Sequence, residues 1–153
     1  MSDAQTPYLN PGLPAPVTEN DGLSTPYRDG LRDEVLRVQR CGSCGTQQFG
    51  PEWICHRCHS FDMKWEDVAP RGKIYSWSRC WHPVHPALND QGPYLAVLVE
   101  LPHASGVRMM GNLLGDPTQS VEIGDEVEGV FEHHRDNNPP FSLLQWRKTG
   151  GMK

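Results

Sequence analysis

The sequence lacks a long apolar run: its longest, YLAVLVEL at residues 94–101, is only eight residues long. A helix that crosses a bilayer needs about 20 consecutive apolar residues, so no such helix is expected. The first ten residues, MSDAQTPYLN, also have neither the basic start nor the apolar segment of a secretory signal peptide. We therefore expect a cytoplasmic protein without membrane contact, in a compartment where disulfides are disfavoured.

Concentrated positive charge is also missing from this chain, whose formal net charge is −5. Residues 37–73 have six basic and four acidic side chains, whereas residues 74–153 have six basic and nine acidic ones. Nucleic-acid binding obtains much of its affinity from a concentrated basic surface that neutralises phosphates. The charge distribution therefore disfavours nucleic acid as a partner.

Known catalytic signatures are absent too: there is no G-x-S-x-G, HExxH or phosphate-binding loop. The acidic row Glu126, Glu128 and Glu132 is expected on the wet face of a strand, and EHHRDNNPP (132–140) is expected to be a solvated turn. Cys80 is expected to be a small apolar residue within a strand. We therefore expect a chain that is not catalytic alone.

What the sequence does have is cysteine in a specific pattern, RCGSCGTQQFGPEWICHRCHSF at residues 40–61. Two Cys-x-x-Cys pairs are present: Cys41 with Cys44, and Cys55 with Cys58. Four thiolates complete a closed tetrahedral shell, which predicts one structural zinc ion per chain. A redox motif would normally be a single cysteine pair in a βαβ unit, which is missing here. Iron can be bound by the same four cysteines, so the sequence leaves iron open as an alternative to zinc.

The residue after each cysteine pair fits a tight turn. Gly45 follows the first pair and can adopt a positive φ at no steric cost. His59 follows the second pair, and histidine tolerates that region better than most residues. His56 and His59 could each replace a cysteine ligand, but four cysteines already satisfy the metal, so we expect both to face solvent.

The chain before the cysteines divides at about residue 25. Residues 1–25 contain four prolines and little periodic apolar signal, which predicts an extended arm that is flexible or bound to a partner. Thr25 before Pro26 is a good helix start, so residues 26–70 are predicted to hold a short helix followed by the zinc ribbon. VLRVQRC (35–41) also fits a strand that enters the metal site.

After the cysteines, the apolar period changes to two. Five segments rich in β-forming residues, separated by Gly- and Pro-marked turns, are 72–81, 94–101, 107–114, 125–134 and 141–148. Five strands in about 75 residues favour a five-stranded OB-fold barrel over a seven-stranded sandwich. The predicted fold is therefore mainly β, with residues 71–153 as an OB-fold domain.

A zinc ribbon followed by a five-stranded barrel resembles the acyl-CoA-associated OB-fold proteins that have an N-terminal rubredoxin-like zinc ribbon. The resemblance covers residues 26–147 and rests on YRDGLRDEVLRVQRC, CGSC, FGPEWIC, CHRC, RGKIYSWSRC, GPYLAVLVEL, GVRMMGNLLG and IGDEVEGVFE, in this order. Two departures are Glu52-Trp53, where the family commonly has a proline-arginine stretch, and His59, where it has glycine.

This resemblance implies a function as well as a fold. Members are small accessory subunits of thiolase-fold enzymes, including thiolases and steroid side-chain retro-aldolases, and the partner holds the catalytic residues. We expect such a partner here, with acyl-CoA at the shared interface. Trp53, Phe61, His82 and His85 are the candidate contacts with substrate or partner.

Two other functions stay open on the sequence. One is single-stranded nucleic-acid binding, because zinc ribbons and OB-folds can both bind nucleic acids and Tyr75, Trp77 and Trp81 could stack on bases. The other is a stand-alone enzyme that uses the CWHPVHP loop, whose His82 and His85 could bind a substrate carbonyl or a phosphate of CoA.

Overall fold

A computed structural model describes residues 13–17 and 21–150, so most of the predicted arm lies outside the described residues. The helix α1 (Thr25–Arg32) begins next to Pro26, as predicted, with Ser24 at its N-cap. Gly30 and Leu31 are its buried residues, and α1 contacts both the ribbon and the barrel through β1 and β8. Within residues 13–17 and 21–150, no helix is long and apolar enough to cross a membrane.

The zinc-ribbon region is a small antiparallel sheet in the order β2-β1-β3. Its strands are β1 (Leu36–Cys41), β2 (Gln47–Gln48) and β3 (Met63–Val68). The segment before the first cysteine is thus a strand rather than a continuation of the helix. The sequence did not predict β3, because the apolar–charged alternation in MKWEDV covers only its first four residues and breaks at Asp67.

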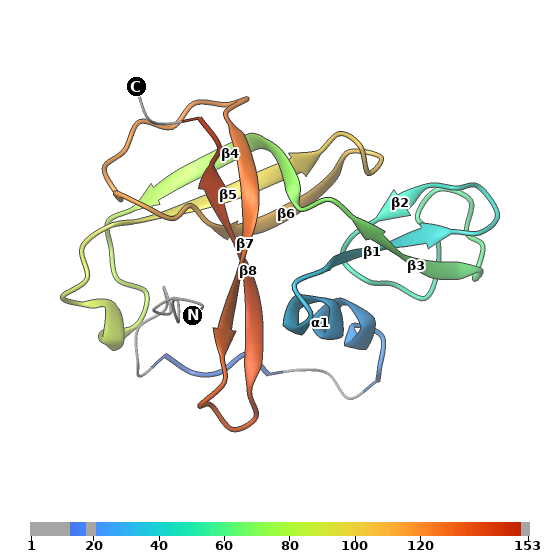
Figure 1. Ribbon diagram of the computed structural model, residues 1–153, viewed down its shortest axis with the longest axis horizontal. Helices are drawn as coiled ribbons and strands as arrows, with labels where there is room; N and C mark the ends of the chain where they lie inside the picture. Colours follow the sequence, from blue (N-terminus) through green and yellow to red (C-terminus); the bar gives the residue numbers. More distant parts are fainter. Residues whose placement is uncertain (1–12, 18–20, 151–153) are drawn as a thin grey trace.

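The second region confirms the predicted five-stranded barrel (Figure 1). Its strands are β4 (Arg71–Cys80), β5 (Tyr94–Leu101), β6 (Val107–Asn112), β7 (Glu126–His134) and β8 (Phe141–Lys148). They run antiparallel in the order β6-β5-β4-β7-β8. A parallel bridge between Leu113 and Trp146, with the N–H of Leu114 donating to the carbonyl of Trp146 at 2.8 Å, nearly closes the barrel.

The core of the barrel is organised around β5, which lies between β4 and β6. Alternate residues of β5 are fully buried: Leu95, Val97, Val99 and Leu101. Trp146 on β8 is the largest fully buried side chain, and Gly111 makes room for it. A Cβ atom at Gly111 would lie 2.8 Å from Cδ1 of Trp146, so a larger residue would displace the indole.

The prediction that the three acidic side chains of β7 all face solvent is wrong for one of them. Glu126 and Glu128 are exposed, but Glu132 is only 6% exposed. Its carboxylate accepts a hydrogen bond from Nε2 of Gln145 at 2.8 Å and lies 2.7 Å from Nε2 of His134. His134 stacks on Phe141 with ring centroids 4.3 Å apart, so residues 132–134 belong to a packed polar cluster, whereas residues 135–140 form the exposed turn expected of this segment.

Candidate metal centre

The first cysteine loop closes through backbone hydrogen bonds. The N–H of Cys41 donates to the carbonyl of Thr46 at 2.9 Å, and the N–H of Gly45 donates to the carbonyl of Cys41 at 2.9 Å. Gly45 has φ +74°, which is the left-handed conformation expected of it. The N–H of Cys44 lies 3.5 Å from Sγ of Cys41, so the turn also donates to a sulfur.

The second cysteine loop repeats the first. The N–H of Cys55 donates to the carbonyl of Ser60 at 2.9 Å, and the N–H of His59 donates to the carbonyl of Cys55 at 3.0 Å. His59 occupies the position of the first loop's glycine and has φ +60°. The N–H of Arg57 lies 3.4 Å from Sγ of Cys55. Both loops therefore direct their sulfurs inward by the same turn.

The four sulfurs fit one zinc ion. All four Sγ atoms lie within 4.8 Å of one another. Sγ of Cys41 is 3.5 Å from that of Cys58, and Sγ of Cys44 is 3.6 Å from that of Cys55. A tetrahedral site with zinc–sulfur bonds of about 2.3 Å has sulfur–sulfur edges of about 3.8 Å. The donor set is closed, so bound zinc would hold the two loops together without an open position for a substrate.

The first cysteine loop also favours the thiolate form that zinc requires. In the second loop the Ser60 N–H lowers the pKa of Cys58, but burial and the neighbouring thiols outweigh this effect and raise that pKa to about 12. The Thr46 hydroxyl, 3.3 Å from Sγ of Cys44, lowers the pKa of Cys44 to about 6, and the Thr46 backbone N–H acts in the same direction. The N–H of Cys44 is the main cause that lowers the pKa of Cys41. Because metal ligands must be deprotonated, these hydrogen bonds prepare the site for the metal.

Two buried glutamines position the loop that leads to the second cysteine pair. Gln39 on β1 accepts a hydrogen bond from the N–H of Glu52 and donates one to its carbonyl, both at 2.9 Å. Gln48 on β2 donates to the carbonyl of Ile54 at 3.1 Å and accepts from the N–H of His56 at 3.1 Å. The sequence analysis did not identify either residue. Gln39 and Gln48 become noticeable only once the pairing of β1 with β2 places them opposite each other.

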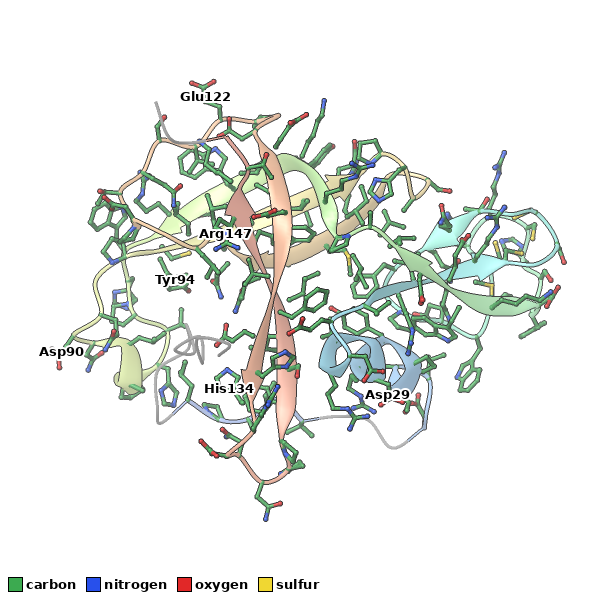
Figure 2. The ribbon with its side chains drawn as sticks, in the orientation of Figure 1. Asp29, Asp90, Tyr94, Glu122, His134 and Arg147 are labelled. Atoms are coloured by element: carbon green, nitrogen blue, oxygen red, sulfur yellow. The ribbon has the colours of Figure 1, made fainter. Side chains whose placement is uncertain are left out.

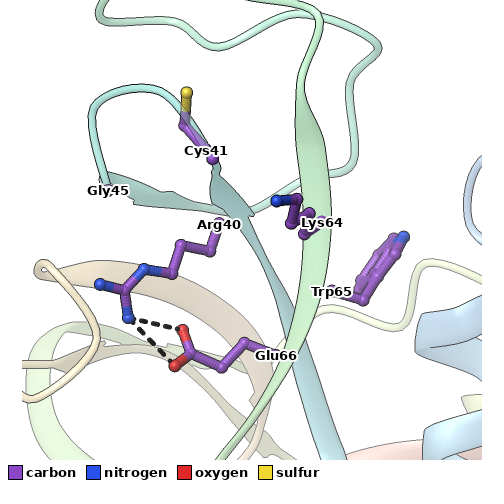
Figure 3. A pocket seen from close by; sticks show the side chains of 7 residues that line it. Arg40, Cys41, Gly45, Lys64, Trp65 and Glu66 are labelled. Atoms are coloured by element: carbon purple, nitrogen blue, oxygen red, sulfur yellow. Dashed lines mark hydrogen bonds and ion pairs between the residues drawn. The ribbon is translucent and has the colours of Figure 1, made fainter.

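A pocket of about 360 Å³ lies beside the first cysteine loop (Figure 3). It is lined by Arg40, Cys41, Gly42, Gly45, Lys64, Trp65 and Glu66. Nη1 of Arg40 lies 3.1 Å from Oε1 of Glu66, and Nζ of Lys64 lies 3.8 Å from Oδ2 of Asp62. The basic groups of the pocket thus have acidic partners already, which makes it a poor site for an anion.

The ribbon is fixed to the rest of the chain by contacts that do not involve Trp53. The N–H of Gln47 donates to Oγ of Ser105 in the β5–β6 turn at 3.2 Å. Tyr27 of α1 packs edge-on against Phe49 with centroids 4.9 Å apart, and burial raises the pKa of Tyr27 to about 12. Trp53 is 59% exposed, so it is free for other contacts.

The other candidate contact residues have different surroundings. Phe61 on the ribbon is 77% exposed, and His82 is exposed in the β4–β5 loop. His85 is half-buried, and its Nδ1 accepts a hydrogen bond from the N–H of Ala87 at 3.1 Å, which caps the short helix η1 (Pro86–Leu88). The structure therefore gives His85 a local structural role that explains its place in the loop.

Two further histidines on the β7–β8 hairpin, His133 and the His134 labelled in Figure 2, also make contacts within the fold. The ring of His133 lies between Oγ of Ser142 at 2.8 Å and Oε1 of Glu34 at 3.1 Å. His134 is held by Glu132, as described above. The ring of His133 therefore joins β7 to β8 and to Glu34, which follows α1, and His134 makes a contact within β7, so both histidines have structural roles.

The aromatic residues that could have stacked on bases do not form an open platform. The guanidinium of Arg108 covers Tyr75, with Cζ 3.5 Å from the ring centroid. Trp77 is half-buried against the core, and Arg79 lies over its ring at 5.4 Å. Of the three, only Trp81 is strongly exposed. The nucleic-acid alternative is therefore not favoured.

Comparison with known proteins gives the family. The model for the ChsH2 rubredoxin-like zinc ribbon domain matches residues 28–64, and that for the ChsH2 C-terminal OB-fold domain matches residues 65–132. A solved structure described as an Ltp2-ChsH2(DUF35) aldolase is 30% identical with a TM-score of 0.73, covering 89% of this chain and 100% of that chain. The chain belongs to the DUF35 family. The resemblance noted from the sequence is confirmed.

Two curated relatives of the DUF35 chain are named as enzyme subunits. The benzoylsuccinyl-CoA thiolase subunit BbsA of Geobacter metallireducens is 28% identical over 83% of this chain and 81% of its own length. A probable enoyl-CoA hydratase alpha subunit of Thermomonospora curvata is 34% identical over 74% of this chain. The DUF35 chain spans only 34% of that hydratase subunit, which is a longer protein.

Proposed function

We propose that this DUF35 protein is a non-catalytic accessory subunit of a thiolase-fold enzyme that acts on acyl-CoA thioesters. The partner forms or breaks a carbon–carbon bond, as in thiolysis or in retro-aldol cleavage of a steroid side-chain acyl-CoA. This chain stabilises the partner and helps to shape the acyl-CoA site at the shared interface. The assembly is cytoplasmic.

The observation that most supports this proposal is the exposure of large apolar side chains outside the core. Trp53 and Phe61 are exposed on the ribbon, and Trp81 and Val84 are exposed in the β4–β5 loop. Large aromatic residues on a surface are typical of the anchors in protein interfaces. The closed cysteine site adds structural rigidity rather than chemistry, and two relatives are named as subunits of a CoA thiolase and of an enoyl-CoA hydratase, which supports the proposal.

The experiment is to isolate the tagged chain from its own host and to identify what accompanies it by native mass spectrometry. We expect a thiolase-fold subunit, and we expect acyl-CoA turnover by the pair but not by this chain alone. Recovery of the chain as a solitary species would refute the proposal. Tight, salt-sensitive binding of a single-stranded oligonucleotide would instead favour the nucleic-acid alternative.

Trp53→Ala is the variant that tests the ribbon contact. Removal of a buried tryptophan anchor typically weakens an interface by about 2 kcal/mol or more, which is about 30-fold in Kd. Ile123→Ala is the matched control, because Ile123 is 74% exposed in a different loop. Complex formation unchanged by Trp53→Ala at sub-micromolar concentration would remove Trp53 from the interface.

A further inference from the structure

The four cysteines of the metal site differ in their exposure to solvent. Cys41 and Cys55, the first of each pair, are at most 1% exposed. Cys44 and Cys58, the second of each pair, are exposed. A zinc ligand must be a thiolate, which is the nucleophilic and oxidisable form of cysteine. Two thiolates of this group, which we call the cysteine cluster, are therefore accessible to a small solute.

Each exposed cysteine has a buried cysteine of the other loop next to it. Sγ of Cys44 lies 3.6 Å from Sγ of Cys55, and Sγ of Cys58 lies 3.5 Å from Sγ of Cys41. Both of these short pairs join the first cysteine loop to the second. Cysteines that are oxidised reversibly are accessible and have a second cysteine close enough to form a disulfide. The cluster contains this arrangement twice.

Contacts that do not involve the metal also hold the two loops against each other. The hydroxyl of Ser43 in the first loop lies 2.8 Å from the hydroxyl of Ser60, which follows the second pair. Nη1 of Arg57 in the second loop donates to Oγ1 of Thr46, which follows the first pair, at 3.3 Å. These contacts join the same two loops as the short sulfur pairs, so they favour bonds between the loops over bonds within one loop.

We propose that the cysteine cluster is a site of reversible oxidation by hydrogen peroxide, which replaces the zinc ion by two disulfides between the loops. The products are Cys44–Cys55 and Cys41–Cys58, each made from one exposed and one buried cysteine. This modification goes beyond the accessory role proposed above and does not depend on it. In the cytoplasmic compartment expected for the chain, disulfides are usually transient, with catalytic or redox-sensing roles.

The steps balance with hydrogen peroxide as the only oxidant. The exposed thiolate attacks the peroxide, the O–O bond breaks, and the sulfur becomes a sulfenic acid while hydroxide leaves. The buried thiolate of the other loop attacks that sulfur, forms the S–S bond and expels a second hydroxide. Each disulfide thus gives two electrons to one peroxide, and the two hydroxides take two protons from the buffer. A disulfide sulfur has no negative charge to offer a metal, so zinc is released.

The first measurement is zinc release from the holo-protein, followed with a coloured chelator during addition of hydrogen peroxide and compared with a sample that receives none. We expect about one zinc ion released for two peroxides consumed, and zinc uptake again after reduction with dithiothreitol. Cys80 is the internal reference, because it is half-buried at the end of β4 and lies outside the cluster. Its oxidation should be at least about tenfold slower than that of the cluster.

The second measurement is the pairing of the disulfides. Digestion with trypsin and a glutamate-specific protease yields peptides 41–52, 53–57 and 58–64, which hold two, one and one of the cluster cysteines. Disulfides between the loops would join all three peptides, whereas disulfides within each pair would leave 41–52 separate. Fragmentation of the joined product in the mass spectrometer should show Cys44 bonded to Cys55.

Three results would overturn the proposal. They are zinc that stays bound after Cys80 is already oxidised, disulfides within the pairs, and sulfinic acid on the exposed cysteines without any disulfide. Cys80→Ser is the matched control variant, because it keeps all four ligands, and it should release zinc at the rate of the wild type. A slower release from this variant would assign the first oxidation to Cys80 and contradict a site at the cluster.

Discussion

Removal of zinc should unfold the ribbon loops while the barrel stays folded. Between Gly42 and Asp62, a stretch that the structure describes completely, only Gln48 and Cys55 are buried. Apart from Phe49, which packs against Tyr27, these 21 residues bury little apolar surface that could offset the entropy of ordering them. The barrel, in contrast, has a continuous apolar core that includes Leu95 and Trp146.

The free energies of ordering this segment and of binding zinc decide whether it stays folded without the metal. Ordering the backbone costs about 1 kcal/mol per residue or more, so fixing this stretch costs on the order of 20 kcal/mol before hydrogen bonds are counted. A structural zinc ion supplies about 10–16 kcal/mol in small zinc domains. Without that contribution, the few hydrogen bonds of Gln39 and Gln48 are insufficient, and the segment opens locally rather than with the whole protein.

Hydrogen exchange read by mass spectrometry tests this expectation on the holo-protein, on protein stripped with a chelator, and on Cys55→Ala. Amides of residues 42–62 should lose protection in the last two samples, and those of β5 should keep theirs. A freshly purified protein should contain one equivalent of zinc. The reasoning fails if residues 42–62 stay protected after zinc is lost, or if β5 loses protection together with them.

Three smaller predictions follow from particular contacts. His59→Gly should slow the loss of zinc to a chelator, because glycine relieves about 1 kcal/mol of strain in the left-handed conformation of residue 59. His59→Val should speed the loss of zinc, and equal rates for the two variants would contradict this explanation. Gln48→Leu leaves the N–H of His56 and the carbonyl of Ile54 without their partner, so zinc affinity should fall about 10-fold or more in a competition assay. Asp125→Asn should lower the free energy of unfolding at pH 7 by about 1 kcal/mol, because Nζ of Lys148 and then the N–H of Glu122 hold the pKa of Asp125 below its ordinary value. That stability is present above about pH 4 and is lost as pH falls through the lowered pKa, so urea titrations of wild type and variant should converge in acid.

The features that the sequence predicted well are those set by local chemistry. Cysteine spacing predicted the metal site, and Gly45 and His59 were expected in the left-handed conformation in which they are found. The period-two segments predicted all five barrel strands to within two residues at each end, because apolar alternation follows directly from which side of a strand is buried.

The features that were missed depend on partners distant in sequence. β3 is a strand because it pairs with β1 along its whole length, whereas its own apolar–charged alternation breaks at Asp67. Glu132 is buried because Gln145 approaches it from β8, which no pattern along β7 could reveal.

Only Ala69 and Pro70 separate β3 of the ribbon from β4 of the barrel. The carbonyl of Pro70 accepts from the N–H of Gly129, and that of Ala69 accepts from the N–H of Arg71 at 2.9 Å, so both residues of this link are held by hydrogen bonds. Successive residues of a strand face opposite sides of the sheet. One extra residue in this link would therefore turn the two cysteine loops toward the opposite side of the molecule. The length of a two-residue link therefore sets the direction in which Trp53 and Phe61 reach.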